Sequence, residues 1–380
     1  MHIRAIPMPL HQRVGMYLKK NIVLCIAFMA AVLTTAAVPV DKAYLGYFDL
    51  RTLTCLFCVL AVVCALKNIS FFYLLASAIV RRFRNARLSV LELVYITFIG
   101  SMLIANDMAL LTFLPLGYFV LHTTGKEKYM AFTFIMQNIA ANLGGMLTPF
   151  GNPQNLYLYS KFAIPNAEFM AIMAPPFILA IAMITLCCLV FVKPEPLCMQ
   201  QQRLAFKPKR TAAYLALFAL SIAIVFRGIP YIIGLAVIPV ALSFLDKKAL
   251  KDVDYGLLLT FVFFFIFSGN MARIDAVRNM FSFLLEKNTL LVSIGSCQLI
   301  SNVPSAILLS QFTGNYSDLL LGVNIGGTGT LIASLASLIT FREYASHNPG
   351  KTGQYVALFS AFNFLFLGVL TCFVMLLGAR

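Results

Sequence analysis

Long apolar runs occupy most of this chain and set the strictest limit on how it folds. Hydrophobic residues make up 61% of the sequence and charged residues only 11%, whereas a soluble domain carries about 25% charged residues. About 20 apolar residues are enough to cross a bilayer as a helix, so a chain of 380 residues holds about ten spans. The sequence therefore predicts an all-α polytopic membrane protein without a separate soluble domain.

A polar, helix-breaking segment occurs twice within these runs. The first copy covers residues 142–155 and the second residues 324–337. Asn142 aligns with Asn324, and in both copies a Gly pair and then a Thr follow at the same spacing. Paired hydrophobic segments that are interrupted at corresponding places in two halves of a chain indicate the binding site of a secondary transporter. We expect two broken transmembrane helices, over residues 129–158 and 316–341.

Two further apolar segments suit helical hairpins better than single spans. Residues 88–120 are interrupted by Ala105-Asn106-Asp107, and residues 289–312 by Ser301-Asn302-Val303-Pro304-Ser305. Irregular backbone at membrane depth is tolerated only where it is buried in protein or lines a watery cavity. We therefore expect two re-entrant hairpins whose tips face each other or a common cavity.

The remaining apolar runs and the basic residues predict the topology. A basic amphipathic stretch precedes each hairpin, at 67–87 and 271–287, and each is expected to lie at the membrane interface. If the N-terminus is cytoplasmic, about three quarters of the 29 Lys and Arg residues fall on the cytoplasmic side, as the positive-inside rule requires. This distribution accounts for the net charge of +15 without a nucleic-acid partner. Ordinary spans are expected at 21–40, 50–66, 168–192, 211–227, 230–245, 254–270 and 354–377.

The two halves then cross the membrane in opposite senses, which makes them inverted repeats. The N-terminal repeat covers residues 1–192, a cytoplasmic linker covers 193–210, and the C-terminal repeat covers 211–380. In this topology the C-terminus lies outside the cell.

Asp107 is the most informative single residue. An ionisable group within an apolar segment is costly, so a functional role is its default interpretation: it binds a coupling cation or carries a proton. The alternative is a carboxylate that is paired with a buried donor. The helix ends at the hairpin tips expose N–H groups that suit an anion and carbonyls that suit a cation. Alternatively, the Asn and Ser residues there only cap helix ends.

Signatures of other protein classes are missing from the sequence. It contains no HExxH or GxSxG motif and no Cys/His cluster, and its nine Cys residues lie mostly in apolar runs, where Cys behaves as a small hydrophobe. We therefore expect no enzyme, no cofactor and no metal site, with Na⁺ as the candidate coupling ion.

Four short segments carry a resemblance to a known family: residues 105–107, 151–155, 301–304 and 324–327. They resemble the ion transporter superfamily, and within it the ArsB/NhaD anion permeases and their citrate-transporter-like relatives, which are related to the divalent anion:sodium symporters. Dicarboxylate-transporting relatives carry Ser-Asn-Thr at both tips. Here Asn106 and Asn302 match the Asn, whereas Asp107 and Val303 replace the Thr. The Ala-Asn-Asp tip is more similar to the arsenite and sodium/proton branch.

The resemblance implies a secondary transporter that works by elevator-type alternating access and forms a homodimer through its scaffold. We expect it to move a small anion or oxyanion, coupled to Na⁺ or H⁺, across the plasma (inner) membrane of a bacterium. The expected substrate-binding residues are Asn106, Asn152, Asn155, Ser301, Asn302, Ser305 and Thr328. The expected coupling-ion residues are Asp107, Asn106, Thr148, Gly151, Asn302, Asn324, Gly326 and Gly327, with the ion nearer the first polar segment.

Several alternatives stay open at this point. A Na⁺/H⁺ antiporter of the NhaD type is favoured by Asp107, although the apolar runs contain few other carboxylates, and an arsenite efflux permease fits the same tip. A membrane enzyme that acts on lipid or prenyl substrates needs clustered acids or a nucleophile–base pair, and none is evident in the sequence. A channel is the last alternative, but hairpins that enter from opposite sides favour alternating access.

Overall fold

The computed structural model describes residues 22–74, 85–197 and 208–378. Every regular element in these ranges is a helix, and none of them is a strand. The elements are α2 (Ile22–Ala37), η1 (Lys42–Tyr47), α3 (Leu50–Asn68), α5 (Ala86–Ile104), α6 (Asn106–Thr123), η2 (Glu127–Tyr129), α7 (Met130–Gly144), η3 (Gly145–Leu147), α8 (Pro153–Lys161), α9 (Asn166–Phe191), α10 (Pro208–Val225), α11 (Tyr231–Leu245), α12 (Lys247–Lys251), α13 (Tyr255–Ala272), α14 (Asp275–Ile300), α15 (Asn302–Leu309), α16 (Tyr316–Ile325), α17 (Leu335–His347), η4 (Pro349–Lys351) and α18 (Thr352–Gly378).

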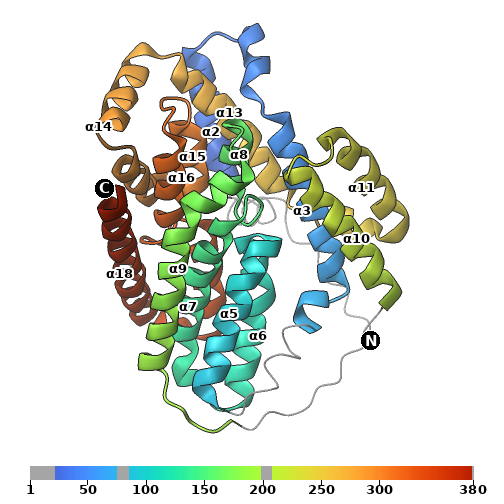
Figure 1. The fold of residues 1–380 in the computed structure, drawn as a ribbon, viewed down its shortest axis with the longest axis vertical. Coiled ribbons are helices and arrows are strands. Elements are labelled where there is room, and N and C mark those ends of the chain that lie inside the picture. The colour runs from blue at the N-terminus through green and yellow to red at the C-terminus, as the bar shows by residue number, and fades with distance from the viewer. Residues whose placement is uncertain (1–21, 75–84, 198–207, 379–380) are drawn as a thin grey trace, which may run out of the picture.

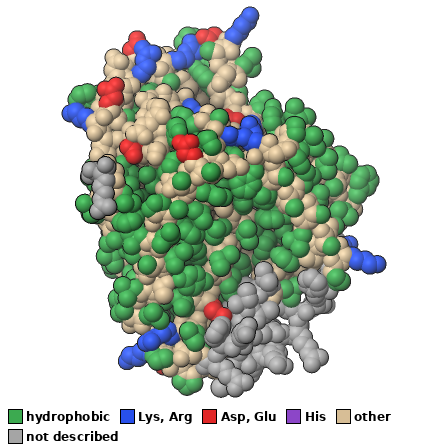
Figure 2. All heavy atoms as spheres, in the orientation of Figure 1, with side chains coloured by type: hydrophobic (Ala, Val, Ile, Leu, Met, Phe, Trp, Pro, Cys, Tyr) green, Lys and Arg blue, Asp and Glu red, His purple; other side chains and the backbone are tan. Residues whose placement is uncertain are grey.

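The surface is that of a protein embedded in a bilayer. Apolar side chains cover the middle of the visible face, and most charged side chains lie toward its two ends (Figure 2). Among the described residues, six helical stretches are long and apolar enough to cross a membrane. The six are Leu50–Asn68, Ala86–Ile104, Asn166–Phe191, Pro208–Val225, Lys247–Ala272 and Pro349–Gly378. Two shorter apolar helices are also present, Val23–Ala37 and Tyr231–Leu245. The prediction of an all-helical integral membrane protein is confirmed.

Two pairs of helices form hairpins in which a single residue joins the two arms. α5 packs against α6 with Ala105 between them, and α14 packs against α15 with Ser301 between them. In Figure 1 the first pair lies in the lower half of the molecule and the second in the upper half. α14 is interrupted at Asn288 (φ −164°, ψ 91°), whose side chain accepts a hydrogen bond from the Leu291 amide at 2.8 Å. Asn288 thus separates the amphipathic segment from the arm that leads to the tip.

Both long helices that were expected to be broken are interrupted. After α7 and η3 the chain is extended at Asn152 (φ −136°, ψ 142°) and α8 begins at Pro153. The N–H that proline lacks has no partner in the first turn of a helix, and the residue before proline disfavours helical geometry. The second break lies between α16 and α17, where Gly329 has a φ of 113° that favours glycine.

The helices form two groups. In one group, α3 packs on α10, α11 and α12, while α13 runs along α2. In the other, α5 and α6 pack on α7, α17 packs on α6 and α7, and α18 packs on α9. α3 and α13 of the first group contact α8 and α15 of the second. We call these the α3–α13 group and the hairpin group.

Some predictions fall outside the described residues. These are the structure of residues 1–21, residues 75–84 of the amphipathic stretch 67–87, and residues 198–207 of the linker. The described start of the linker is held by Glu195, which accepts hydrogen bonds from Lys126 (2.7 Å), Lys128 (2.6 Å) and Tyr129 (2.9 Å). This cluster, the Glu195 clamp, ties the linker to the turn between α6 and α7.

Candidate functional site

The two hairpin tips share an unusual backbone conformation. Ala105 has φ 67° and ψ 151°, and Ser301 has φ 74° and ψ 159°. Non-glycine residues rarely adopt this conformation, which costs about 1–3 kcal/mol. In each tip the next residue is an Asn that begins the following helix, and its side-chain oxygen accepts the amide hydrogen of the residue after it at 2.9 Å.

Each tip is fastened to one helix break by the same two hydrogen bonds. The Asn106 amide donates to the Gly151 carbonyl at 3.1 Å, and the Asn302 amide donates to the Ala333 carbonyl at 2.9 Å. A threonine hydroxyl then donates to the carbonyl three residues before the tip. These pairs are Thr148 with Met102, at 2.8 Å, and Thr330 with Gln298, at 3.3 Å.

Close backbone approach explains why glycine occupies equivalent places at both breaks. A Cβ atom on Gly144 would lie 2.3 Å from the Phe98 carbonyl oxygen, and one on Gly326 would lie 2.9 Å from Cys297 Cβ. Both distances are shorter than van der Waals contact. The arms of the hairpins therefore pack directly on the backbone of the broken helices.

A network of buried amides joins the two breaks to each other. Asn324 donates to the Asn155 side chain at 2.6 Å and accepts from the Asn152 side chain at 3.2 Å. Asn152 also donates to the Asn142 carbonyl, and Asn106 donates to the Asn142 side chain. All five side chains belong to residues that are at most 3% exposed. The breaks of the two helices thus meet at the centre of the molecule.

The backbone carbonyls of the breaks are largely occupied. Asn155 donates to the carbonyls of Gly145, Met146 and Thr148, and Gln298 donates to those of Gly326 (2.8 Å) and Thr328 (3.1 Å). A carbonyl oxygen has two lone pairs, so these groups keep limited capacity for a cation. One amide side chain at each break thus donates hydrogen bonds to the carbonyls that the interrupted helix leaves open.

A small cavity of about 40 Å³ lies between the two tips. A water needs about 10–15 Å³ measured in this way, so the cavity has room for a few waters or one small ion. α2 and α13 close it on one side through Val23, Leu257 and Thr260. Its other lining residues belong to the hairpin group: Asn106, Asp107, Pro153, Gln154, Ser301, Asn302, Val303, Pro304 and Leu335.

Four helices begin at this cavity. Its lining includes the first residue of α6 (Asn106), α8 (Pro153), α15 (Asn302) and α17 (Leu335). The start of a helix carries a partial positive charge of about half an elementary charge, because its first N–H groups lack intrahelical partners. These four helix starts contribute positive potential to the cavity, which suits an anion, whereas the Asp107 carboxylate contributes a negative charge when it is ionised.

Two buried oxygen atoms next to the cavity have no hydrogen-bond partner within the described ranges: Asp107 Oδ1 and Gln154 Oε1. An acceptor without a partner at a buried position costs free energy of about 1–3 kcal/mol. These two atoms are consequently available to a proton, a cation or a donor on a substrate. The described part of the chain has no group of three or more His, Cys, Asp or Glu residues that is able to hold a metal ion.

The expected site residues fall into two sets. Asn106, Asp107, Ser301 and Asn302 line the cavity. The others belong to the bracing around it: Ser305 bonds to the Ser296 hydroxyl at 2.8 Å, and Thr328 donates to the Ile325 carbonyl at 2.7 Å. The remaining bracing residues are Thr148, Gly151, Asn152, Asn155, Asn324, Gly326 and Gly327.

Three residues near the cavity were not anticipated. Gln154 lies inside the first polar segment, so its position in the sequence was a usable signal. Gln298 and Thr260 lie in apolar runs, where a lone polar side chain carries little information.

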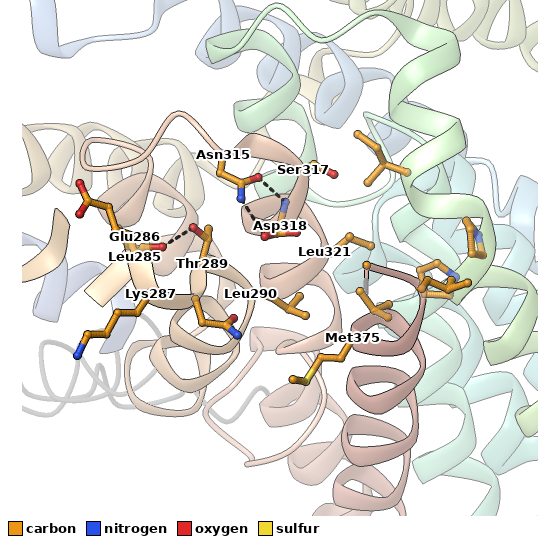
Figure 3. A pocket seen from close by; sticks show the side chains of 17 residues that line it. Leu285, Glu286, Lys287, Thr289, Leu290, Asn315, Ser317, Asp318, Leu321 and Met375 are labelled. Carbon is orange, nitrogen blue, oxygen red and sulfur yellow. Dashed lines mark hydrogen bonds between the residues drawn. The ribbon is translucent and has the colours of Figure 1, made fainter. Parts of the chain in front are cut away.

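A wider pocket of about 600 Å³ lies elsewhere, between α14, α16, α9 and the end of α18. Figure 3 shows Asn315 and Asp318 bonded to each other on one side of it, and Glu286 and Lys287 on another. The pocket carries no net positive charge, because the carboxylates of Glu286 and Asp318 outnumber the ammonium group of Lys287. None of the expected site residues lines it.

Membrane-length helices and two helical hairpins whose tips meet at a central cavity are features of membrane transporters. The chain belongs to the citrate transporter family, CitMHS, whose model matches residues 14–317. It is 33% identical over 311 residues to an uncharacterized transporter of Methanocaldococcus jannaschii, a match that covers 81% of this chain and 84% of that protein. It is 31% identical over 280 residues to the inner membrane protein YbiR of Escherichia coli, which covers 72% of this chain and 74% of that protein. The resemblance is confirmed, and the chain is a membrane transporter and not an enzyme.

Proposed function

We propose that the chain is a secondary transporter of a small multivalent anion of the citrate class, which it binds between the two hairpin tips. The observation that carries this proposal is the convergence of four helix starts on one cavity. Asn106, Asn302 and Ser301 supply amide and hydroxyl groups beside those helix starts. The cavity holds a few waters at most, so it must widen to admit a tricarboxylate.

The widening follows from the place of the cavity between the two helix groups. α2 and α13 form one wall and the hairpin group forms the rest. Movement of the hairpin group along α3 and α13 exposes the tips to one side of the membrane and then to the other. This is elevator-type alternating access, in which re-entrant hairpins and broken helices travel against a scaffold formed by the α3–α13 group.

The proposed organisation is a pair of inverted repeats, residues 1–192 and 211–380, joined by the linker 193–210. The matching hydrogen bonds at the two tips support it. In each half, the amide of the tip Asn donates to a carbonyl in the helix break, that of Gly151 in the first half and Ala333 in the second. In each half, a threonine hydroxyl of the break also donates to a carbonyl in the first arm of the hairpin. The alignment of Asn142 with Asn324 places these partners in equivalent positions.

Asp107 is the proposed coupling residue. Its side chain is the carboxylate that lines a cavity otherwise surrounded by helix starts. An ionised carboxylate repels an incoming anion across a few ångströms of low-dielectric protein. A proton or Na⁺ on Asp107 removes this repulsion, so the anion and the cation enter together. Asn106 and the Gly151 carbonyl, to which the Asn106 amide donates, are the neighbouring groups proposed to complete a cation site.

Uptake by protein reconstituted into liposomes tests this proposal. We expect labelled citrate or another di- or tricarboxylate to accumulate when a pH or Na⁺ gradient is imposed. Asp107→Asn is expected to keep downhill exchange and to lose the stimulation by the gradient. Asp275→Asn is the matched control, because this exposed carboxylate pairs with Arg278 at 2.5 Å, far from the cavity along α14.

Two outcomes contradict the proposal in different ways. If Asp107→Asn keeps full gradient-driven accumulation, the coupling role of Asp107 is wrong. If the wild-type protein moves none of the carboxylates or oxyanions in a panel that includes arsenite, whatever gradient is imposed, anion transport itself is wrong.

A second candidate function is Na⁺/H⁺ antiport of the NhaD type, and the free Oδ1 atom of Asp107 favours it. In that case Na⁺ and H⁺ compete for Asp107 and no organic anion is needed. Addition of Na⁺ to proteoliposomes without any carboxylate then releases protons. Arsenite efflux, the third candidate, is distinguished by arsenite movement in the same vesicles.

We also propose that the protein is a homodimer through α10 and α11. Ile232, Val240 and Phe244 recur at helical spacing on α11 and are 64%, 57% and 86% exposed, and this helix lies at the edge of the molecule (Figure 1). Such a face suits helix–helix packing in a bilayer. Native mass spectrometry in detergent is expected to show dimers, and monomers at every concentration contradict this assembly.

The proposed orientation in a plasma (inner) membrane has the N-terminus in the cytoplasm and the C-terminus outside. A membrane-impermeant thiol reagent then labels Gly314→Cys from outside the cell. Ser346→Cys is expected to be labelled only after the membrane is opened. The reverse pattern overturns the orientation.

A further inference from the structure

A third cavity, of about 560 Å³, opens at the end of the molecule that carries η1 and the start of α3. We call it the vestibule. The α3–α13 group contributes η1, the start of α3 and the end of α13, and the hairpin group contributes α8 and Gln311. Its volume is sufficient for a small carboxylate with its hydration water.

The charges in the vestibule are unbalanced toward positive. Arg51 and Lys161 both line it, and neither has an ion pair or a side-chain hydrogen bond in the part of the chain that the structure describes. Lys161 lies over the Tyr157 ring, at 5.8 Å, and is attracted by the charge of Asp49 without forming an ion pair with it. Arg273 is neutralised by Asp41 at 2.7 Å. Asp49 is engaged as the cap of α3, where it accepts from the Thr52 amide at 3.0 Å and from the Thr52 hydroxyl at 2.5 Å.

The vestibule and the tip cavity share their walls. On α8, Gln154 lines the cavity, and Tyr157 and Lys161 line the vestibule. Residues spaced three and four apart lie on one face of a helix, so these three side chains follow each other along one path. α13 also contributes to both spaces, with Thr260 at the cavity and Phe265 at the vestibule.

Tyr157 lies on α8 between Gln154 of the tip cavity and Lys161 of the vestibule. The Tyr157 hydroxyl is 2.9 Å from the Ser310 hydroxyl, and its ring packs against Phe265 with 5.6 Å between centroids. Tyr157 is 2% exposed. A solute that travels along this face of α8 therefore meets Lys161 first, then Tyr157, and then the hairpin tips.

Resting on the proposed function, we infer that the vestibule is a separate recruitment site for the carboxylate substrate, in which Arg51 and Lys161 bind the anion before it passes Tyr157. Arg51 belongs to the α3–α13 group and Lys161 to the hairpin group. The anion therefore bridges the two groups at this stage. Arg51 presents a planar fork that suits a carboxylate, and Lys161 presents a compact charge.

Transport kinetics provide the first test. Arg51→Gln and Lys161→Gln are each expected to raise the KM for citrate about 5-fold, the value for one partly exposed charge pair, while the maximal rate stays near that of the wild type. Lys161→Arg is expected to restore the wild-type KM. The matched control is Lys287→Gln, which removes one exposed lysine from the other pocket. A wild-type KM in both glutamine variants overturns the inference.

Chemical labelling tests the vestibule independently of transport. Ser160 lines it, so Ser160→Cys is introduced in a background without Cys25, Cys198 and Cys372. An anionic methanethiosulfonate reagent is expected to react several-fold faster than a cationic one, and Lys161→Gln is expected to remove this preference. Citrate is expected to slow the reaction.

The two tests separate two kinds of failure. If the anionic preference and the citrate protection are present but no carboxylate is transported, the recruitment site stands and the proposed function fails. If wild-type protein transports citrate but the reagents react at rates that Lys161→Gln leaves unchanged, the vestibule does not select anions and the inference fails.

Discussion

Ala105 and Ser301 hold a backbone conformation that the rest of the molecule imposes on them. Both residues are fixed because the amide of the following Asn is bonded to a carbonyl in a helix break. A turn of one residue lets the next helix start directly at the cavity. The strained turn, which costs about 1–3 kcal/mol at each tip, is therefore what places Asn106 and Asn302 at the cavity.

The strain at the first tip predicts a stabilising substitution. Ala105→Gly removes the clash of Cβ with the backbone, while glycine adds about 0.5–1 kcal/mol of chain entropy to the unfolded state. We expect the free energy of unfolding to rise by up to about 2 kcal/mol, measured by unfolding in mixed micelles. Ala109→Gly, the same change inside α6, should lower it by about 1 kcal/mol. Equal destabilisation by both substitutions contradicts the strain at Ala105.

The Glu195 clamp predicts a pH dependence of stability. Hydrogen bonds from Lys126, Lys128 and Tyr129 lower the pKa of Glu195 to about 2. A carboxyl group whose pKa is lowered on folding stabilises the protein above its unfolded pKa, and this contribution is lost as the pH falls toward the folded pKa. We expect Glu195→Gln to lower the unfolding temperature at neutral pH. The difference from wild type should shrink as the pH falls from about 4.5 toward 2, and a difference that is constant with pH contradicts the clamp.

Single residues were predictable where a polar group interrupts an apolar run. Asn106, Asp107 and Asn302 stand out in this way, and all three line the cavity. The bracing role of Gln298 was not predictable, because it depends on the Gly326 and Thr328 carbonyls, which lie 28 and 30 residues away in the sequence. Local pattern identifies polar groups, whereas three-dimensional packing decides which of them face the cavity.

At the level of elements, the contact between the two broken helices depends on Asn155 and Asn324. Their side chains are bonded at 2.6 Å and both are buried. We expect Asn155→Ala and Asn324→Ala each to lower the free energy of unfolding by about 1–3 kcal/mol, because each leaves a buried group without a partner. The double variant should lose about 1 kcal/mol less than the sum, since one hydrogen bond is shared.

A second pair of substitutions controls this cycle. Asn270 bonds to Thr34 and Thr35 and shares no hydrogen-bond partner with Asn155. Asn155→Ala and Asn270→Ala should therefore be additive within about 0.5 kcal/mol. If the losses of unfolding free energy at Asn155 and Asn324 are also additive, the two side chains are not coupled and the predicted direct link between the breaks is wrong.

Element boundaries followed well from the sequence because apolar runs and polar breaks fix them. The hairpin predicted for 88–120 extends over α5 and α6, and the interruption predicted within 316–341 lies between Ile325 and Leu335. Hydropathy alone gives no sign of the hairpin turn after α5, because α5 is apolar and long enough to cross a membrane, yet α6 packs back against it beyond Ala105. The polar Asn106-Asp107 pair was the signal that identified this turn.

At the scale of the whole molecule, the division into two helix groups did not follow from the sequence. Nothing in the apolar runs of α2 and α13 shows that these helices pair, although they are far apart in the chain and pack along each other. The division determines where a ligand is able to bind, because the tip cavity and the vestibule both lie between the groups.

Relative motion of the two groups predicts that a cross-link between them stops transport. Gly46 on η1 and Ser160 on α8 line the vestibule from opposite groups, and a Cβ at Gly46 meets no atom within 4 Å. A flexible dithiol-reactive linker between Gly46→Cys and Ser160→Cys should abolish citrate uptake, and reductant should restore it. The same linker between Tyr118→Cys on α6 and His347→Cys on α17, whose rings stack inside the hairpin group and do not line the vestibule, should leave uptake intact. Uptake that continues with the first pair fully cross-linked shows that the hairpin group does not move against α3 and α13, because the linker then joins two parts that stay together throughout the cycle.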